Sequence, residues 1–313
     1  MGIPHLNRYL LNNCSNQSIG KKHLSSFAGK TIVIDTSIYL YKFIGCNALM
    51  ENMYSMITTF RYYGITPIFI FDGKPPEEKK ELLKQRYMDK KAAEAKYNAL
   101  KQKLETVAPD EKTEIAVELD KLRMRFIRIK REDIDQVKSL MESCGVQYYD
   151  AIGEADHMCA KMVINKQAWA CMSDDMDMFV YGCTRVMRHI SLLNHTVIFY
   201  NTNGILRELQ IHMKHFREIM ILSGTDYNLN GPTNDLNKMM KQFRQFKLDE
   251  PDGDRMFREW LKERPEHEFD YDTLCRVYDM FYITDKSEIV PCISSPNLDR
   301  MKTILKPYGF VFV

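Results

Sequence analysis

Four short runs of apolar residues have the composition of buried β-strands. Each is rich in aliphatic or aromatic side chains and is bounded by turn formers or charges, and they are Thr31–Ile34, Ile68–Phe71, Ala168–Met172 and Val197–Tyr200. Runs that are apolar throughout, without polar alternation, are typical of parallel strands buried on both faces. Segments with helical periodicity lie between them and can supply the crossover connections that parallel strands need. The pattern predicts an α/β fold with a doubly wound, mainly parallel sheet flanked by helices. The functional site of such a sheet is expected at the carboxyl ends of its strands.

Residues 74–132 follow a different pattern, in which few apolar residues are spaced regularly among charges. Two series repeat with alternating steps of four and three, namely Ala93, Tyr97, Leu100, Leu104 and Val107, then Ile115, Leu119, Leu122, Phe126 and Ile129. A break at Ala108-Pro109-Asp110 separates the series. The pattern predicts a helical hairpin inserted into the fold and closed along one seam. A solvated coiled-coil hairpin that joins two chains remains an open alternative on this pattern alone.

The chain from residue 205 to residue 313 is mostly helical in pattern. Clusters of turn formers interrupt it at 223–226, 228–237 and 249–254. There is no internal repeat and no low-complexity linker. We therefore expect one domain over residues 1–313, with the hairpin as an insertion and a C-terminal helical layer on the same body.

The composition, 45% hydrophobic and 27% charged over 313 residues, is that of an ordinary globular protein. No run approaches the roughly 18 apolar residues that a membrane span needs, and the first residues lack the apolar core of a signal peptide. The eight cysteines form no C-x-x-C pair, so we expect buried thiols and no zinc site. These features predict an intracellular protein without a membrane partner.

The net charge of +2 hides an uneven distribution. Residues 74–131 hold 17 Lys and Arg against 11 Asp and Glu, so the remainder of the chain is acidic. A basic insertion on an acidic body indicates a polyanionic ligand held beside a carboxylate-rich site.

Seven acids lie at the ends of predicted strands or helices. They are Asp35, Asp72, Glu154, Asp156, Asp175, Asp177 and Asp226. Any one of them alone could cap a helix. If the strand ends converge, however, their mutual repulsion requires cations, and ligands that are all oxygen favour Mg²⁺ or Mn²⁺ over zinc. Two such ions suit the hydrolysis of a phosphodiester.

Other phosphoryl and acyl chemistries lack their motifs. There is no G-x-x-x-x-G-K-[ST] loop for ATP and no G-x-S-x-G nucleophile elbow. Asp35-Thr36-Ser37 lacks the second acid of the D-x-D motif used by aspartyl-phosphate enzymes.

Several motifs resemble those of the flap endonuclease family of structure-specific 5′-nucleases, with a PIN-like core. The resemblance extends from Met1 to about Asp226, in the same order along the chain. The matching segments are Met1-Gly2-Ile3, Ile34-Asp35, Phe71-Asp72-Gly73-Lys74-Pro75-Pro76, Gly153-Glu154-Ala155-Asp156, Asp174-Asp175-Met176-Asp177, Val186-Met187-Arg188-His189 and Ser223-Gly224-Thr225-Asp226-Tyr227.

The resemblance implies two Mg²⁺ ions, for which Mn²⁺ could substitute. One ion would be held by Asp35, Asp72, Glu154 and Asp156, and the other by Asp175, Asp177 and Asp226, with Asp156 able to serve both. Lys79 and Arg86 match the cations that contact the scissile phosphate, and Tyr41 matches a tyrosine that stacks on the terminal base. On the sequence alone the two cations would be solvated helix charges, and Tyr41 could equally be a packed core aromatic. The DNA-binding set implied is Gly2, Tyr41, Lys74, Lys79, Lys80, Lys84, Arg86, Arg128, Lys130 and Arg188.

The chain departs from the family pattern at three places. Asp156 stands where the family has Glu, and only Gly231-Pro232 remains of the loop that grips duplex DNA through a monovalent cation. The last residues lack the family's sliding-clamp peptide, so clamp partnership is not supported. This divergence is compatible with a compact, virus-encoded member.

The implied activity is that of a Mg²⁺-dependent DNA endonuclease and 5′–3′ exonuclease acting in replication, repair or recombination. Its partner would be DNA with a 5′ flap, nick or junction, and the protein would be a monomer in the nucleus or at a cytoplasmic site of viral replication. A nuclease that is mainly a 5′–3′ exonuclease, or one directed at RNA, is the first alternative. A catalytically silent nucleic-acid-binding scaffold is the second.

Overall fold

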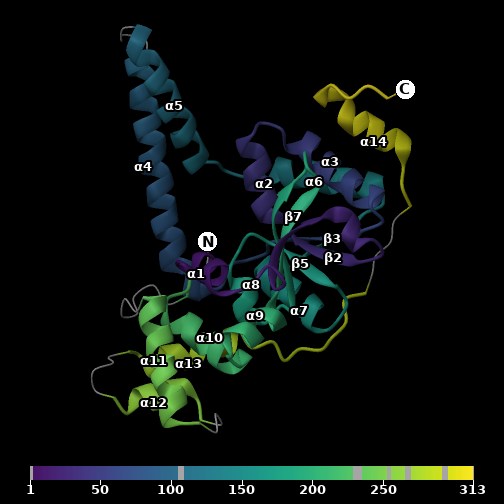
Figure 1. The fold of residues 1–313 in the computed structure, drawn as a ribbon. Helices are drawn as coiled ribbons and strands as arrows, with labels where there is room; N and C mark the ends of the chain where they lie inside the picture. The colour runs from purple at the N-terminus through teal and green to yellow at the C-terminus, as the bar shows by residue number, and fades with distance from the viewer. Residues whose placement is uncertain are drawn as a thin grey trace. The chain divides into compact units, whose positions relative to one another are not determined.

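The computed structural model describes residues 3–104, 109–227, 235–251, 255–264, 269–290 and 295–312, with only the backbone at 109–111. These residues form two compact units, each assembled from three stretches of chain. Figure 1 shows the helices and strands with the labels used below. The sheet unit comprises residues 1–36, 57–74 and 147–292, and the hairpin unit comprises 37–56, 75–146 and 293–313. Within the described ranges, no helix is both long enough and apolar enough to cross a membrane. The single domain over 1–313, with its insertion at 74–132 and helical region at 205–313, stays a prediction.

The sheet unit is built on one seven-stranded sheet with the order β1-β7-β6-β5-β2-β3-β4. The strands are β1 (Ile19–His23), β2 (Thr31–Asp35), β3 (Thr66–Phe71), β4 (Gln147–Asp150), β5 (Ala170–Met172), β6 (Arg185–Ser191) and β7 (Thr196–Asn201). The central pairs from β6 to β4 are parallel, whereas β1–β7 and β6–β7 are antiparallel. The prediction of a mainly parallel sheet is therefore confirmed, and all four predicted runs are strands.

Both faces of the central strands are buried, as the continuous apolar runs predicted. In β2, Val33 belongs to the core of the sheet unit, and its neighbours Ile32 and Ile34, which point to the opposite face, are also fully buried. Ile68 and Phe69, two consecutive residues of β3, are also both buried. Because side chains alternate across a strand, burial of consecutive residues requires cover on both faces.

Helices of the sheet unit pack around this core. They are α1 (Leu6–Asn13), α7 (Ala155–Ile164), α8 (Asp177–Tyr181), α9 (Thr202–Leu209), α10 (Met213–Leu222), α11 (Leu236–Asp249), α12 (Phe257–Lys262) and α13 (Tyr271–Met280), with a 3₁₀ turn at Leu24–Phe27. Among them, α7 lies against β2, β3 and β5, the strands that carry the acidic ends. Gly231-Pro232, which the sequence analysis compared with the family's duplex-binding loop, lies outside the described residues.

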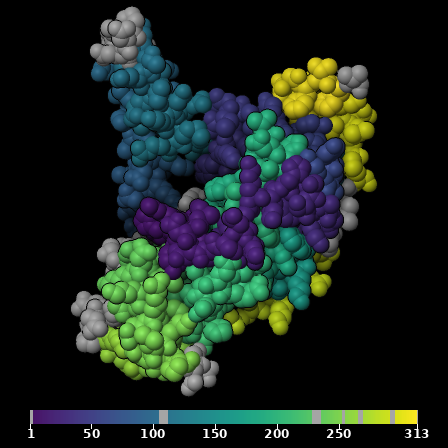
Figure 2. All heavy atoms as spheres, in the orientation of Figure 1, coloured from purple at the N-terminus to yellow at the C-terminus, as the bar shows by residue number. Residues whose placement is uncertain are grey.

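The hairpin unit contains the predicted pair of long helices, α4 (Lys80–Leu104) and α5 (Pro109–Arg125), which pack side by side (Figure 2). Its other helices are α6 (Arg131–Cys144) and α14 (Leu298–Leu305), with 3₁₀ turns at Glu77–Lys79 and Lys306–Tyr308; α2 (Thr36–Gly45) and α3 (Leu49–Tyr62) run across the boundary between the units. Ala93, Leu119 and Leu122 are buried, and every other described residue of the predicted seam is half-buried. The seam predicted from the spacing of apolar residues is therefore present between α4 and α5 as far as Leu122, whereas Phe126 and Ile129 lie beyond the end of α5.

Candidate active site

The predicted acids lie at the carboxyl ends of three neighbouring strands. Asp35 is the last residue of β2, Asp72 follows β3, and Asp175 lies in the loop after β5. Because β3, β2 and β5 are adjacent and parallel, their ends meet at the same edge of the sheet. This edge, where open α/β folds bind ligands, forms the candidate site.

Of the three acids at the ends of these strands, Asp35, Asp72 and Asp175, Asp35 is the most buried, with 4% of its surface exposed. Burial, together with the nearby carboxylates of Asp72 and Asp175, raises the pKa of Asp35 to about 7, although hydrogen bonds from Ser173 and Asp156 oppose the shift. The Ser173 hydroxyl donates to Asp35 Oδ2 at 3.0 Å. Three other predicted acids, Asp72, Asp175 and Asp156, thus lie close enough to act on the Asp35 carboxylate.

Asp72 is positioned by a close approach of two loops. After β3 and β4 end, their pairing continues, since Gly73 N donates to the Gly153 carbonyl at 2.7 Å. A Cβ on Gly73 would lie 2.0 Å from the carbonyl oxygen of Ala151, so only glycine fits here. The approach brings Asp72 Oδ1 within 2.7 Å of the backbone N–H of Ala155, the first residue of α7. Asp72 therefore does bind a helix N-terminus, as the capping interpretation expected, while its carboxylate stays next to Asp35.

Glu154 and Asp156 flank the start of α7, and both are half-buried. The hydroxyl of Tyr227 donates to Glu154 Oε2 at 2.7 Å, and the hydroxyl of Tyr181 lies 3.4 Å from that of Tyr227. Burial raises the pKa of both tyrosines, so both hydroxyls remain protonated and able to donate. Asp226 lies half-buried in the turn after α10, directly before Tyr227.

Asp175 and Asp177 belong to a tightly folded connection between β5 and α8. The Ser173 hydroxyl accepts from Asp175 N at 3.1 Å, and Asp175 Oδ1 accepts from Asp177 N at 3.0 Å. Both acids are buried. Sequence reasoning did not assign roles to Ser173 or Tyr227, although each is adjacent to or within a motif that it singled out.

The site suits a hard divalent cation because its candidate ligands are carboxylates. In addition, the groups that shift the pKa of the buried Asp35 include two repelling carboxylates and no cation. Within the described residues, however, no three acids, cysteines or histidines converge on a single metal-sized point. The described carboxylates therefore match such an ion in chemistry.

The predicted cations of the hairpin unit have different environments. Lys79 is buried, Arg86 is half-buried, and Lys80 and Lys84 are exposed. Lys80 lies 3.8 Å from Glu77, an exposed pair that contributes little to stability.

Tyr41 on α2 is 41% exposed, which excludes the interpretation of a fully packed core aromatic. The ammonium of Lys90 on α4 lies 4.7 Å from the centre of its ring. The two residues line a pocket of about 320 Å³ together with Lys42, Arg125 and others. Among the described residues that line this pocket there is no acid, so it offers an aromatic face among cations.

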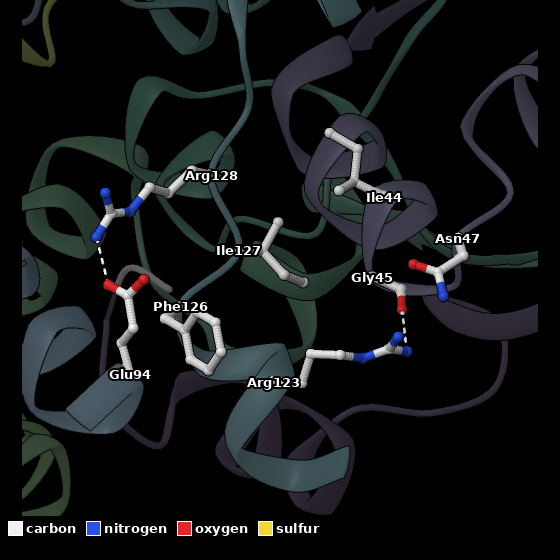
Figure 3. A pocket seen from close by; sticks show the side chains of 8 residues that line it. All are labelled: Ile44, Gly45, Asn47, Glu94, Arg123, Phe126, Ile127 and Arg128. Atoms are coloured by element: carbon white, nitrogen blue, oxygen red, sulfur yellow. Dashed lines mark hydrogen bonds and ion pairs between the residues drawn. The ribbon is translucent and has the colours of Figure 1, made fainter. Parts of the chain in front are cut away.

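A second pocket of about 300 Å³ lies between the α2–α3 connection and the base of the hairpin (Figure 3). Phe126 and Ile127 form part of its apolar lining. Arg128 forms an ion pair with Glu94 at 2.6 Å, and Arg123 donates to the Gly45 carbonyl at 3.1 Å. The predicted DNA-binding residue Arg128 therefore already has an acidic partner.

Four predicted DNA-binding residues remain to be located. Lys74 and Lys130 are exposed, and Gly2 lies outside the described residues. Arg188 is buried in β6, where its guanidinium donates to Asn7 Oδ1 at 2.9 Å and to the Asp174 carbonyl at 2.7 Å. These bonds hold Arg188 within the sheet unit, and its assignment as a DNA-binding residue stays a prediction.

Comparison with protein families identifies two matching regions. Residues 1–93 match the XPG N-terminal domain and residues 145–226 match the XPG I-region. The chain is 31% identical over 235 residues to flap endonuclease 1 of Methanococcus aeolicus, with 69% of each chain covered. It is 29% identical over 246 residues to flap endonuclease 1 of Zea mays, covering 72% of this chain and 62% of that protein. The chain thus spans less than two thirds of the length of the maize relative.

Solved structures show the same fold. The catalytic core of Rad2 in complex with a DNA substrate superposes with a TM-score of 0.64 at 23% identity, covering 98% of this chain and 94% of that one. The Holliday junction-resolving enzyme GEN1, in complex with product DNA and Mg²⁺, gives a TM-score of 0.54 at 14% identity, covering 98% and 69%. At these identities the likeness establishes the architecture.

Proposed function

The chain belongs to the flap endonuclease family, and from this premise we propose that it hydrolyses phosphodiester bonds in DNA near junctions of single and double strands. The observation that carries the proposal is the association of Asp35 with Asp72, Asp156 and Asp175 where three parallel strands end. A capping role would account for each acid separately, but not for the buried Asp35 carboxylate beside three other acids, two of which repel its charge. A site of this kind suits metal-assisted cleavage of a phosphodiester.

The relatives imply a divalent cation, and we propose two Mg²⁺ ions, with Mn²⁺ as a substitute. Asp35, Asp72, Glu154 and Asp156 would hold one ion, and Asp175, Asp177 and Asp226 the other. When bound, such ions polarise the phosphate and lower the pKa of an attacking water. The chain's own contribution is to orient the ligands: Ser173 holds Asp35, and Tyr227 holds Glu154.

The hairpin unit would guide the DNA strand. We propose that Lys79 and Arg86 contact the scissile phosphate and that Lys74, Lys80, Lys84, Arg128 and Lys130 contact the backbone. The exposed ring of Tyr41, beside Lys42, Lys90 and Arg125, supports stacking on a terminal base with phosphates held nearby. Stacking is tolerant of sequence, which suits an enzyme that recognises DNA structure.

The preferred substrate would be a 5′ flap, nick or junction met in replication, repair or recombination. The protein would act as a monomer wherever that DNA is processed, either in the nucleus or at a viral replication site. A mainly exonucleolytic enzyme or an RNA-directed nuclease shares the same site chemistry and is the second candidate.

Cleavage assays on three 5′-labelled substrates test this proposal. We expect the wild-type protein to cut a flap and a nicked duplex with Mg²⁺, to cut an RNA hairpin poorly, and to do nothing in EDTA. Preferential cleavage of the RNA would favour the second candidate, and binding of all three without any cleavage would favour a scaffold.

Substitution of Asp175 or Asp177 by Ala should abolish cleavage while DNA affinity stays within several-fold, since these acids are proposed to bind metal and not phosphate. Asp174→Ala is the matched control in the same loop, because Asp174 accepts a backbone bond from His189 at 2.7 Å and is not among the proposed ligands. Activity within tenfold of wild type in Asp175→Ala or Asp177→Ala would refute the two-metal assignment.

A further inference from the structure

Three aromatic residues at the end of α13 reach toward the elements that carry the acids. Tyr278, Phe281 and Tyr282 form this group, which we call the aromatic clamp. Phe281 is fully buried, Tyr278 is half-buried and Tyr282 is 57% exposed. The clamp lies far along the sequence from every predicted ligand, and all of its contacts described below are within the sheet unit.

Phe281 fixes the tyrosine that holds Glu154. Its ring centre lies 5.3 Å from that of Tyr227 at an interplanar angle of 84°, and 4.8 Å from that of Tyr181 at 61°. Such edge-to-face contacts restrict ring orientation and contribute about 0.5–1.5 kcal/mol each beyond burial. Because the Tyr227 hydroxyl donates to Glu154 Oε2, the orientation of the ring helps to set where this carboxylate points.

Tyr278 and Tyr282 reach α8 through Arg217. The Arg217 guanidinium lies 5.2 Å from the ring of Tyr278 and 5.3 Å from that of Tyr282. The same buried side chain donates from Nε to the Val180 carbonyl at 2.9 Å and from an Nη to the Tyr181 carbonyl at 3.3 Å. A cation at these last carbonyls stabilises the C-terminus of α8, the five-residue helix that begins with Asp177.

The segment that follows the clamp, residues 285–290, is also hydrogen-bonded to residues of the sheet unit. Lys161, near the end of α7, donates to Asp285 Oδ2 and to the Ser287 hydroxyl, both at 2.6 Å. The bond from Lys161 lowers the pKa of Asp285 to about 2. Gln167 donates to the Ile289 carbonyl at 3.1 Å. The clamp is therefore held on one side by α13 and on the other by the anchored segment 285–290.

We propose that the aromatic clamp is a positioning element for the active site, acting on Glu154 through Tyr227 and on Asp177 through Arg217 and α8. The inference rests on the proposed function, because it treats these acids as metal ligands. Groups that orient a ligand without touching the metal commonly change metal affinity by 10- to 100-fold when removed. The clamp thus makes the C-terminal helices part of the metal site's support.

Binding of Mn²⁺, followed by electron paramagnetic resonance of the free ion, tests the inference without relying on cleavage. We expect Tyr227→Phe and Phe281→Leu each to weaken Mn²⁺ binding at one site by about tenfold or more. The double variant should bind no more weakly than Tyr227→Phe alone, because both changes act through the same carboxylate. Tyr200→Phe is the matched control, since it also removes a buried hydroxyl bond of 2.7 Å, to Asn7 Oδ1.

A Mg²⁺ titration of cleavage rate adds a second readout. Tyr227→Phe should raise the Mg²⁺ concentration for half-maximal rate by the same factor while the rate at saturating Mg²⁺ stays within about threefold. Circular dichroism melting in EDTA identifies any variant that fails to fold, and the conservative Tyr227→Phe keeps the test valid if Phe281→Leu does fail.

The outcomes separate the two proposals. Unchanged Mn²⁺ affinity in a folded Tyr227→Phe, or additive losses in the double variant, would overturn the clamp inference alone. Mn²⁺ binding by a wild-type protein that cleaves no DNA would overturn the proposed function alone, and the comparison of variants would still decide the clamp. Absence of Mn²⁺ binding in the wild type would overturn the clamp inference as well.

Discussion

Asp35 illustrates what the site requires of a single residue. Its carboxylate is buried beside Asp72 and Asp175, and its pKa rises to about 7 because burial and like charges both disfavour the ionised form. Only the hydrogen bonds from Ser173 and Asp156 oppose this shift. The metal-free protein therefore carries an electrostatic cost at this position, which a bound cation would relieve.

Asp35→Asn should raise the melting temperature of the metal-free protein by a few degrees at pH 8, because it removes a buried charge and keeps the shape of the side chain. Mg²⁺ should stabilise the wild type, since it binds the folded state, and should stabilise the variant much less. Calorimetry with EDTA and with Mg²⁺ measures both effects. Asp120→Asn, at an exposed position of α5, is the control and should change neither value. An Asp35→Asn variant that melts below the wild type in EDTA would contradict this account.

Gly73→Ala should lower the free energy of unfolding by about 3 kcal/mol, the upper end of ordinary overpacking, because the added Cβ meets backbone that cannot rotate away. Displacing the loop should also move Asp72 and reduce cleavage. Gly153→Ala is the matched control in the paired loop, where a Cβ would meet only the Lys74 carbonyl at 3.9 Å. Urea unfolding of both variants checks the difference, and equal stabilities would show that the loop adapts.

At the scale of elements, the apolar runs predicted β2, β3, β5 and β7 and missed the two edge strands, β1 and β4, together with β6. β6 lies inside the sheet, but Arg188 and His189 interrupt its apolar residues. β2, β3 and β5 are apolar throughout because both of their faces are covered. The edge strand β1 reads Ile-Gly-Lys-Lys-His and exposes its last three residues, so it carries neither an apolar run nor alternation. β4, at the other edge, is mostly half-buried and equally short of apolar residues.

For the candidate site too, the sequence could predict some of the residues and not others. The acids could be predicted because a charge directly after a buried strand is conspicuous in sequence. Their supports could not, because only tertiary packing brings Tyr227 to Glu154, Phe281 to Tyr227, and Arg217 to the carbonyls of α8. No spacing rule joins Phe281 to Glu154.

The hairpin seam gives an element-scale prediction. Leu122→Ala should cost about 2–5 kcal/mol locally, since Leu122 is 2% exposed between α4 and α5. Hydrogen exchange should therefore accelerate across α4 and α5 while the strands stay protected. Val117→Ala, at a half-exposed position of the same helix, is the control. Exchange that accelerates in the strands as strongly as in the hairpin would show that the two units unfold together.

At the scale of the whole molecule, the chain leaves the sheet unit directly after two of its acids. One passage falls after Thr36, next to Asp35, and another after Lys74, next to Asp72. The residues that enter the hairpin unit there lead into α2, with Tyr41, and into α4, with Arg86. The proposed catalytic and strand-guiding residues are therefore linked by very short stretches of chain.

If the hairpin guides a free 5′ end, streptavidin bound to a 5′-biotinylated flap before the enzyme is added should slow cutting by at least tenfold. Streptavidin on the distal end of the duplex is the control and should have little effect. Light scattering should give the mass of a monomer. Full activity on the blocked flap together with a dimeric mass would instead support the coiled-coil alternative for α4 and α5.

The antiparallel pairing of β1 with β7 has a consequence for biosynthesis. Ile19 pairs with Tyr200, so β1, the first strand to leave the ribosome, has no partner until β7 has been synthesised. Non-local pairing of this kind slows folding, and unpaired strand edges expose a growing chain to aggregation. The lysines and histidine of β1 then have a use beyond the finished structure, because charge on an unpaired strand discourages association with other chains. A ribosome stalled before Asn201 should hold a nascent chain that is sensitive to protease throughout β1, and release of a longer chain should protect it.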